Sequence, residues 1–325
     1  MNRKAFVRLV VAVMAVAALV CFISCKRAPA EKTKIRIGYL PYSSALSFFL
    51  AHEKGYFTQA GLTVEPVKCA SANEALDALR SGHLDFVMGV GLSTFFAMEG
   101  ASAGSFRCFQ PCVEDSTHAV SFLLVPKDSV LKQMKELKGK RVGTYSGTSQ
   151  VLVLRLLLRK LGLDPDNPDD VRIGDVASNL QVDALAAGQF DAFLMLEPYA
   201  TKAISVQGAK PLIENPRVKY ILDPFPAGAN AVANKFLSLH PELTQKVVAA
   251  LDHAIEDIHR DETSAKAMLP KYDPTLTADL AAKSSIYRWW KKSETDVIAI
   301  QKYADLLFVE KALKNKVSVE PMFLK

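Results

Sequence analysis

Short apolar runs alternate with longer amphipathic stretches over the first two thirds of the chain. The apolar runs are rich in Val, Ile, Leu and Phe and predict β-strands. They cover residues 34–38, 62–67, 84–90, 141–144, 171–176 and 190–196. The stretches between them predict helices over residues 44–54, 71–80, 149–161 and 178–187. Strands that alternate with helices and are buried on both faces are typical of parallel sheets, so the pattern predicts the α/β class.

The same local pattern occurs twice. Four residues of the first copy recur in the second at nearly the same spacing: Arg36, Asp77, Gly82 and Asp85 match Arg141, Asp183, Gly188 and Asp191. One helix of each copy begins with a capping-box pattern, Ser71 to Glu74 and Ser178 to Gln181, in which side chains satisfy free amides of the first turn. The repeat predicts two α/β lobes of similar topology, each a mostly parallel sheet flanked by helices. The cleft between two such lobes is a common place for a small molecule.

The segments outside the repeat connect and complete the two lobes. Residues 107–125 predict two strands, of which residues 118–125 lead into the second lobe, whereas the Pro and Gly residues of 211–230 predict an irregular return. Pro241 suits the first turn of a helix ending near residue 260, and two further helices are predicted. They cover residues 278–292, where Trp289 and Trp290 would serve in packing, and 295–314. We expect this C-terminal part to pack on the first lobe, which gives boundaries of 35–124 with 226–325 for the first lobe and 125–225 for the second.

The N-terminal segment has the pattern of a secretion signal. A basic start precedes an uninterrupted apolar run over residues 9–23, which is too short for a membrane span of about 20 residues. Ser24 and Cys25 follow, and the whole resembles a bacterial lipoprotein signal, with residues 1–24 removed, Cys25 lipidated and residues 25–34 forming a tether. Plain secretion with cleavage nearby and an uncleaved anchor helix are the alternatives. All three place the folded part outside the cytoplasm, in the cell envelope.

Charge and cysteine content narrow the function classes. The formal net charge of +6 would fall to +3 on loss of the three basic residues of the signal, and the remaining Lys and Arg are scattered among carboxylates. Nucleic acid is therefore not an expected partner. Cys69, Cys108 and Cys112 are either buried thiols or, for Cys108 and Cys112 across a turn at Pro111, a disulfide. No spacing of metal ligands, no nucleotide-binding loop and no nucleophile motif appears, so neither an enzyme nor a metal or cofactor site is expected.

Small polar residues gather where the predicted strands end. Ligands of open α/β sheets bind at these carboxyl ends, and several of the residues also begin helices, whose free amides favour an anionic group. The predicted ligand-binding residues are Tyr39, Tyr42, Ser43, Ser44, Ser71, Asn73, Gly91, Ser93, Thr148, Ser149, Ser178, Glu197 and Tyr199. Alternatives remain for several of them. Ser71 and Ser178 are also explained as helix caps, the tyrosines as filling of the cleft edge, and Glu197 needs a partner that is either a ligand amine or a protein base.

Several short motifs together resemble a known family. They are residues 35–41, 51–57 and 61–65 in the first lobe, 137–143, 191–193 and 197–199 in the second, and 227–228 with 231–233 in the return segment. The combination resembles periplasmic solute-binding proteins of the nitrate/sulfonate/taurine and thiamine-pyrimidine group. The resemblance implies a two-lobed type II periplasmic-binding fold, a monomer, and delivery of a small-molecule solute to the permease and ATPase subunits of an ABC importer. A lipid on Cys25 would hold such a protein at the membrane.

The resemblance leaves the ligand and two other function classes open. The helix starts suit a sulfonate or similar anion, Glu197 and the tyrosines suit an amine-bearing heterocycle such as a pyrimidine, and a zwitterion such as taurine suits both. We expect the lobes to close about a hinge near residues 123–126 and 223–228. The same fold also serves enzymes that make the thiamine pyrimidine and solute-sensing domains. A structural lipoprotein would not need two matched sets of polar strand ends.

Overall fold

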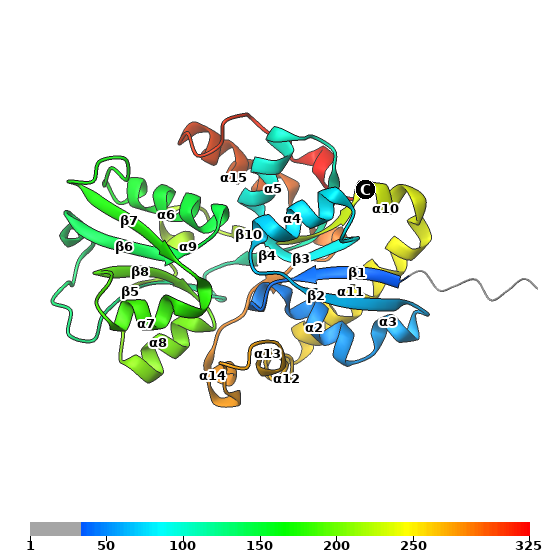
Figure 1. Ribbon diagram of the computed structural model, residues 1–325, viewed down its shortest axis with the longest axis horizontal. Helices are drawn as coiled ribbons and strands as arrows, with labels where there is room; N and C mark the ends of the chain where they lie inside the picture. The colour runs from blue at the N-terminus through cyan, green and yellow to red at the C-terminus, as the bar shows by residue number, and fades with distance from the viewer. Residues whose placement is uncertain (1–33) are drawn as a thin grey trace, which may run out of the picture. The chain divides into compact units, whose positions relative to one another are not determined.

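Two β-sheets organise the part of the chain that the structure describes, residues 34–325. In the computed structural model these residues form one compact unit, with one sheet on the left of Figure 1 and the other near its centre. The predicted signal peptide, the lipidation residue Cys25 and the tether up to residue 33 lie outside the described residues. Among residues 34–325, no helix is long and apolar enough to cross a membrane.

The first sheet has the strand order β11-β4-β10-β3-β1-β2. Its strands are β1 (Lys34–Tyr39), β2 (Thr63–Lys68), β3 (Phe86–Gly91), β4 (Phe106–Glu114), β10 (Phe225–Ala233) and β11 (Arg288–Trp289). The second sheet has the order β7-β6-β8-β5-β9. Its strands are β5 (Ser121–Val125), β6 (Lys140–Tyr145), β7 (Val171–Val176), β8 (Ala192–Leu196) and β9 (Lys210–Glu214). Three strands of each sheet are parallel, and β10 and β5 run antiparallel to their neighbours. The sheets thus contain the parallel strands that the repeat predicts, joined by antiparallel strands where the chain crosses between the sheets.

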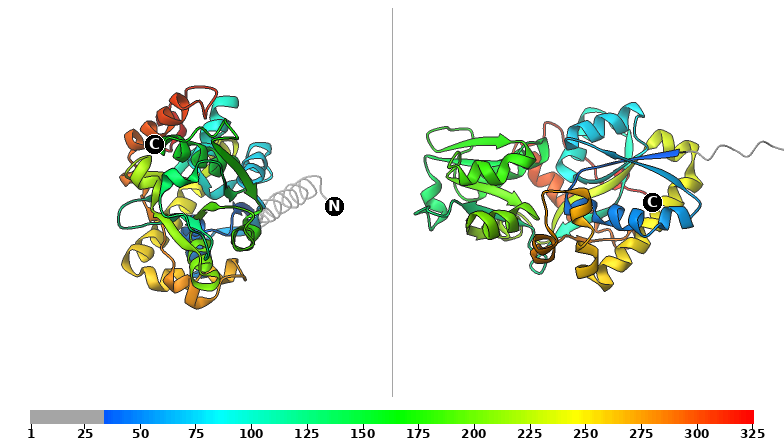
Figure 2. Two further views of the ribbon diagram at one scale, coloured as in Figure 1. Left: turned by 90° about the vertical axis from the view of Figure 1, so that its left-hand side faces the viewer. Right: turned by 60° about the horizontal axis from the view of Figure 1, so that its bottom comes forward.

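Helices flank both sheets (Figure 1; Figure 2). They are α2 (Leu46–Glu53), α3 (Tyr56–Gln59), α4 (Ala72–Ser81), α5 (Leu92–Ala101), α6 (Thr148–Lys160), α7 (Gln181–Ala186), α8 (Tyr199–Gln207), α9 (Pro216–Tyr220), α10 (Asn234–Leu239), α11 (Pro241–Arg260), α12 (Glu262–Lys266), α13 (Leu269–Tyr272), α14 (Ala278–Lys283) and α15 (Val297–Val309). Short 3₁₀ turns are η1 (Ser43–Ala45), η2 (Met134–Leu137), η3 (Ser178–Leu180), η4 (Lys292–Glu294) and η5 (Glu320–Met322). Helix α11, the longest within residues 34–325, begins at Pro241 as predicted, and its apolar face packs on α2 and α3.

The sequence repeat is a structural repeat. The order β2-β1-β3 in the first sheet matches β7-β6-β8 in the second. In each copy the Arg of the first strand donates its backbone amide, at 2.8 Å, and its side chain to the repeated Asp. These pairs, Arg36 with Asp85 and Arg141 with Asp191, tie the first strand of each copy to the start of the third. The repeat therefore encodes the frame of the fold.

The two capping boxes have different outcomes. In the first, the Glu74 amide donates to Ser71 Oγ at 3.1 Å, and the Glu74 carboxylate accepts from the Ala70 amide at 2.7 Å. In the second, the chain forms η3, and Gln181 Nε2 donates to the backbone oxygen of Ser178 instead. The Ser178 side chain therefore does not cap the helix, and its hydroxyl is available for other contacts.

Two segments differ from the prediction because their signals were misleading. Residues 211–230 are not irregular but contain β9, α9 and the start of β10, because Pro216 occupies the first turn of α9 and Pro226 lies where the β10 register shifts. The helix predicted over 278–292 ends at Lys283, and Trp289 lies in β11, where it pairs with Cys112 of β4. Trp289 is thus a packing residue of a strand.

The chain crosses between the sheets twice. Strand β5 pairs with β8 and β9, so the chain enters the second sheet at Ser121. It returns between α9 and β10. The C-terminal part divides, since α15 contacts α5 and β10 of the first lobe whereas α14 contacts α8 of the second. We call the first sheet with its helices lobe 1 and the second sheet with its helices lobe 2.

Candidate functional site

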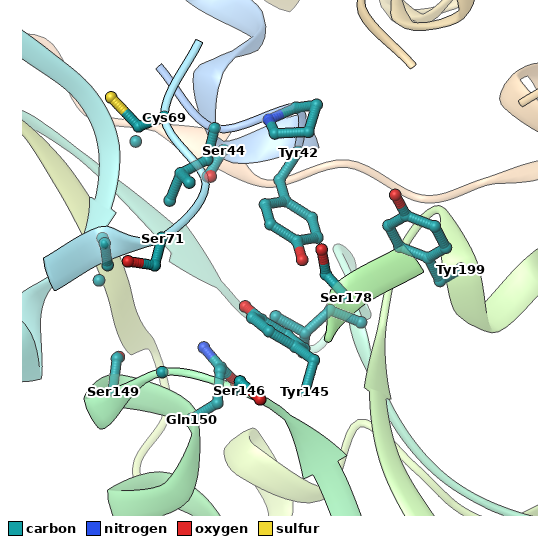
Figure 3. A pocket seen from close by; sticks show the side chains of 18 of the residues that line it. Tyr42, Ser44, Cys69, Ser71, Tyr145, Ser146, Ser149, Gln150, Ser178 and Tyr199 are labelled. Carbon is teal, nitrogen blue, oxygen red and sulfur yellow. The ribbon is translucent and has the colours of Figure 1, made fainter. Parts of the chain in front are cut away.

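A cavity of about 670 Å³ lies between the two lobes. The carboxyl ends of β1, β3, β6 and β8 open onto it, as the strand-end rule predicts for an α/β sheet. Nine of the predicted ligand-binding residues line it: Tyr42, Ser44, Ser71, Asn73, Gly91, Ser149, Ser178, Glu197 and Tyr199. Figure 3 shows hydroxyl groups from both lobes around the same space. The volume fits a small molecule.

Serine side chains and helix starts form one end of the cavity, which we call the serine end. Ser44 lies in η1, Ser71 caps α4, and Gly147 with Ser149 begins α6. Figure 3 shows Ser44 and Ser71 of lobe 1 facing Ser149 of lobe 2. Backbone amides and hydroxyls of these helix starts converge there. None of the residues that these helix starts contribute to the cavity lining is a carboxylate, so the arrangement suits an oxyanion.

Aromatic rings form the other end, which we call the tyrosine end. The rings of Tyr42 and Tyr145 stack with centroids 5.2 Å apart, and Tyr199 meets Tyr42 edge-on at 5.8 Å. Tyr287 lines the same space. The Tyr42 hydroxyl is buried and has no hydrogen-bond partner among the described residues, and in Figure 3 it points into the cavity. A buried polar atom without a partner indicates a place for a ligand atom.

Two buried carboxylates border the tyrosine end. Glu197 is 4% exposed and accepts hydrogen bonds from the amide and the hydroxyl of Thr201, at 3.0 and 2.8 Å. Burial raises the pKa of Glu197 to about 7, against these two bonds, which lower it. Asp273 is 6% exposed and accepts from the Tyr199 hydroxyl at 2.7 Å. The hydrogen-bond partner of Glu197 is therefore, in this structure, a threonine in the first turn of the helix that follows it, α8.

A buried ion pair lies beside the cavity at the crossing between the lobes. Arg217 of α9 donates from Nε to Glu114 Oε2 at 2.6 Å and from Nη2 to the Tyr287 hydroxyl at 3.2 Å. The other oxygen of Glu114 accepts from the amides of Val120 and Ser121, at 2.9 and 2.6 Å. Both charged side chains are about fully buried, 1% and 0% exposed. The pair thus joins the end of β4, the crossing segment and α9.

Four predicted residues do not line the cavity. Tyr39 packs on Phe49 and Tyr272, and Ser43 is buried. Ser93 and Thr148 instead connect the lobes. Ser93 Oγ lies 2.6 Å from Ser149 Oγ, and Thr148 Oγ1 lies 3.1 Å from the amide nitrogen of Asn73. The structure therefore brings these two residues into contact with the opposite lobe rather than with the cavity.

Several lining residues were not predicted from the sequence: Tyr145, Gln150, Cys112, Arg217, Asp273 and Tyr287. Tyr145 ends β6, so the strand-end rule could have found it. Asp273 and Tyr287 come from the C-terminal segment and carry no local signal. Among residues 34–325 the three cysteines are free and buried, and no group of His, Cys, Asp and Glu side chains has the arrangement of a metal site.

Known proteins share this sequence pattern and fold. A model of the NMT1-like family matches residues 28–269. A Bacillus subtilis protein named as a candidate aliphatic sulfonates-binding protein is 27% identical over 88% of this chain and 84% of its own. A 4-amino-5-hydroxymethyl-2-methylpyrimidine phosphate synthase of Saccharomyces cerevisiae is 24% identical over 81% of each chain. The solved structure of the alkanesulfonate-binding protein SsuA from Xanthomonas axonopodis, bound to MOPS, superposes with a TM-score of 0.73 at 23% identity, covering 91% of this chain and 99% of that one. The predicted periplasmic-binding fold and the predicted family group are confirmed.

Proposed function

The chain belongs to the NMT1-like family, and from this premise we propose that it is an extracytoplasmic solute-binding protein of an ABC importer. The observation that carries the proposal is the cavity between the lobes, whose walls supply hydroxyls, amides and aromatic rings from both sides. Relatives and structural neighbours named for sulfonate binding support the same role. The permease and ATPase subunits of the importer are the partners this role requires.

The two ends of the cavity support our proposal for the ligand class. The serine end suits a sulfonate or comparable oxyanion, and the tyrosine end suits a flat ring or a nitrogen group. We therefore propose a sulfonate- or taurine-like solute or a thiamine-pyrimidine-like heterocycle. At about 670 Å³ the cavity is large enough for either.

Mass spectrometry of the ligand released from gently purified protein tests the proposal. We expect a small polar molecule in about equimolar amount. A thermal-shift panel of sulfonates, taurine and pyrimidines then ranks the classes. Protein that carries no small molecule and shows no shift with any member of the panel would contradict the proposal.

Closure of the lobes over the ligand is part of the proposal. The cross-lobe contacts of Ser149 with Ser93 and of Thr148 with Asn73 exist only when the two lobes are close. Ligand that touches both lobes would favour this closed arrangement. Small-angle scattering should therefore show a smaller radius of gyration with the identified ligand than without it, and an unchanged radius would argue against closure.

An enzyme of the same fold is the second candidate, because the yeast relative is named as a synthase. A binding protein returns its ligand unchanged, whereas an enzyme converts it. Incubation of the protein with the recovered ligand, followed by mass spectrometry of both, separates the two functions. We expect the ligand and the protein masses to stay constant.

Lipid anchoring at Cys25 completes the proposal. The signal pattern of residues 1–24 supports it. The full-length protein should partition into detergent and carry the mass of a lipid on Cys25, and the Cys25→Ala variant should do neither. A wild-type protein that is cleaved but carries no lipid would support plain secretion instead.

A further inference from the structure

The C-terminal segment of residues 273–287 forms a third wall of the cavity. It contributes Asp273, Pro274, Thr275 and Tyr287, and it lies beyond residues 28–269, the part of the chain that the family model matches. Helix α13 before it contacts α2 of lobe 1, and α14 within it contacts α8 of lobe 2. This wall is therefore a feature of the present chain that the family match does not describe.

Asp273 is the charged group of this wall. Its Oδ1 accepts from the amide and the hydroxyl of Thr275, at 3.0 and 2.8 Å, and its Oδ2 accepts from the Tyr199 hydroxyl at 2.7 Å. All three donors are neutral. Among residues 34–325, Asp273 forms no ion pair, and Lys271, two residues before it, pairs with Glu53. Buried carboxylates are normally paired with a cation, so Asp273 lacks the partner that its burial calls for.

The other charges at the cavity do not supply that partner. Arg217 is committed to Glu114, and Lys68 is an exposed residue at the cavity edge. Glu197 adds a second buried carboxyl group to the cavity lining. The rings of four tyrosines complete this end, and their faces attract cations. The unpartnered Tyr42 hydroxyl offers an acceptor there as well.

We infer that Asp273 is a specificity-determining residue that selects ligands with a protonated nitrogen, an ammonium or an amidinium group, at the tyrosine end of the cavity. The inference rests on the proposed solute-binding function and names its ligand class more closely. The serine end then holds the anionic or polar remainder of the ligand. A plain sulfonate without a nitrogen group would leave the carboxylate of Asp273 without a counter-charge.

Tyr199 acts as a positioning residue for Asp273. It belongs to α8 of lobe 2, whereas Asp273 follows α13, which packs on lobe 1. Their hydrogen bond therefore joins α8 to the segment that follows α13 and fixes one oxygen of the carboxylate. Loss of the Tyr199 hydroxyl should weaken binding less than loss of the Asp273 charge, because the carboxylate itself remains.

The test compares two matched probe pairs on three proteins. Taurine is paired with isethionate, in which a hydroxyl replaces the ammonium group, and 4-amino-5-hydroxymethyl-2-methylpyrimidine is paired with its 4-hydroxy counterpart. The proteins are the wild type, Asp273→Asn, and Asp279→Asn as a control. Asp279 lies on the same segment, is exposed and pairs only with Lys283 of its own helix among the described residues. Calorimetry measures each affinity, and circular dichroism checks that every variant is folded.

We expect the wild type to prefer one amine-bearing probe over its counterpart, and Asp273→Asn to weaken that probe about 10- to 100-fold while changing the counterpart little. This is the range for loss of one charge-assisted contact. Tyr199→Phe should reduce the same preference by a smaller factor, and Asp279→Asn should match the wild type.

Three results would overturn the inference. The inference would be refuted if the wild type bound isethionate as tightly as taurine and the 4-hydroxy pyrimidine as tightly as its 4-amino partner. That result would leave the solute-binding function intact. An amine preference that persists in Asp273→Asn would refute the role of this residue alone. Absence of binding by all four probes would count against both the inference and the proposed function.

Discussion

Substitution of Gly91 by Ala should hold the two lobes apart. Gly91 ends β3 of lobe 1 with φ −59° and ψ 131°, a conformation open to any residue. A Cβ built there would lie 2.9 Å from Ser149 Cβ of lobe 2 and closer still to its Oγ, whereas its next neighbour, the Ala227 oxygen, is 3.8 Å away. Rotation of Ser149 about χ1 moves Oγ but leaves Cβ in place. The added methyl group therefore conflicts with the closed arrangement and with nothing inside lobe 1.

The magnitude follows from the contacts that closure would lose. Carbon atoms pack at about 3.5–4.0 Å, so the lobes must separate by at least about 0.6 Å at this point. That separation strains or breaks the 2.6 Å hydrogen bond between Ser93 and Ser149, worth about 1 kcal/mol. Overpacking adds about 1–3 kcal/mol. The sum of about 2–4 kcal/mol corresponds to a roughly 30- to 1,000-fold rise in the Kd of a ligand that binds the closed form.

Calorimetry with the solute identified by mass spectrometry, together with small-angle scattering, measures both effects. Gly100→Ala is the matched control, since Gly100 lies near the end of α5, the helix that begins directly after Gly91, and its added Cβ would meet Asn315 at an ordinary 3.5 Å. We expect Gly91→Ala to keep the wild-type Tm without ligand, to bind weakly, and to stay extended when ligand is added. Affinity within threefold of the wild type would refute the steric reasoning.

Three further predictions concern stability. Arg217→Met should lower the free energy of unfolding by about 3–5 kcal/mol because it leaves Glu114 buried and unpaired. Adding Glu114→Gln should restore part of this loss. Denaturant titration measures both, and a double variant no more stable than Arg217→Met would contradict the reasoning. The raised pKa of Glu197, about 7 against 4.5, means that the folded state binds its proton more tightly, so this contribution is complete below about pH 4.5 and is lost as the pH rises through 7. A shift of this size corresponds to about 3 kcal/mol. The free energy of unfolding, measured from pH 4.5 to 8, should therefore decrease less steeply in Glu197→Gln than in the wild type, and equal slopes would contradict this. Asp85→Asn should reduce Tm more than Asp191→Asn, because the Asp85 side chain is 10% exposed and that of Asp191 is 34%; equal shifts would contradict this.

The repeat made the frame of the fold predictable. Strand β7 and helix α11 begin and end where the sequence predicts. Their boundaries follow from local signals, the hydrophobic period for the strand and a proline in the first turn for the helix. Residues 211–230 were misjudged for a related reason. Proline and glycine mark turns when read one by one, but Pro216 begins a helix and Pro226 sits at a register shift, and only the neighbouring strands determine that.

The site was only partly predictable because its walls come from distant parts of the chain. The strand-end rule located Ser44, Ser71 and Ser149, since a parallel sheet places these ends together. It could not locate Arg217 or Asp273. Each owes its place to packing between elements that are far apart in sequence, and neither stands at the end of a parallel strand.

The energetics of closure determine what a ligand must supply. Among the described residues, hydrogen bonds join the lobes from Ser93 to Ser149 and between Asn73 and Thr148, and Arg159 and Lys160 of α6 donate to Glu310, which follows α15. At a net contribution of about 1 kcal/mol each, these bonds favour closure before any ligand is bound. A ligand shifts the balance further only by the free energy of contacts that the open form lacks. On our inference that Asp273 selects a nitrogen cation, that contact is one of them, and selection of the ligand is coupled to closure of the lobes.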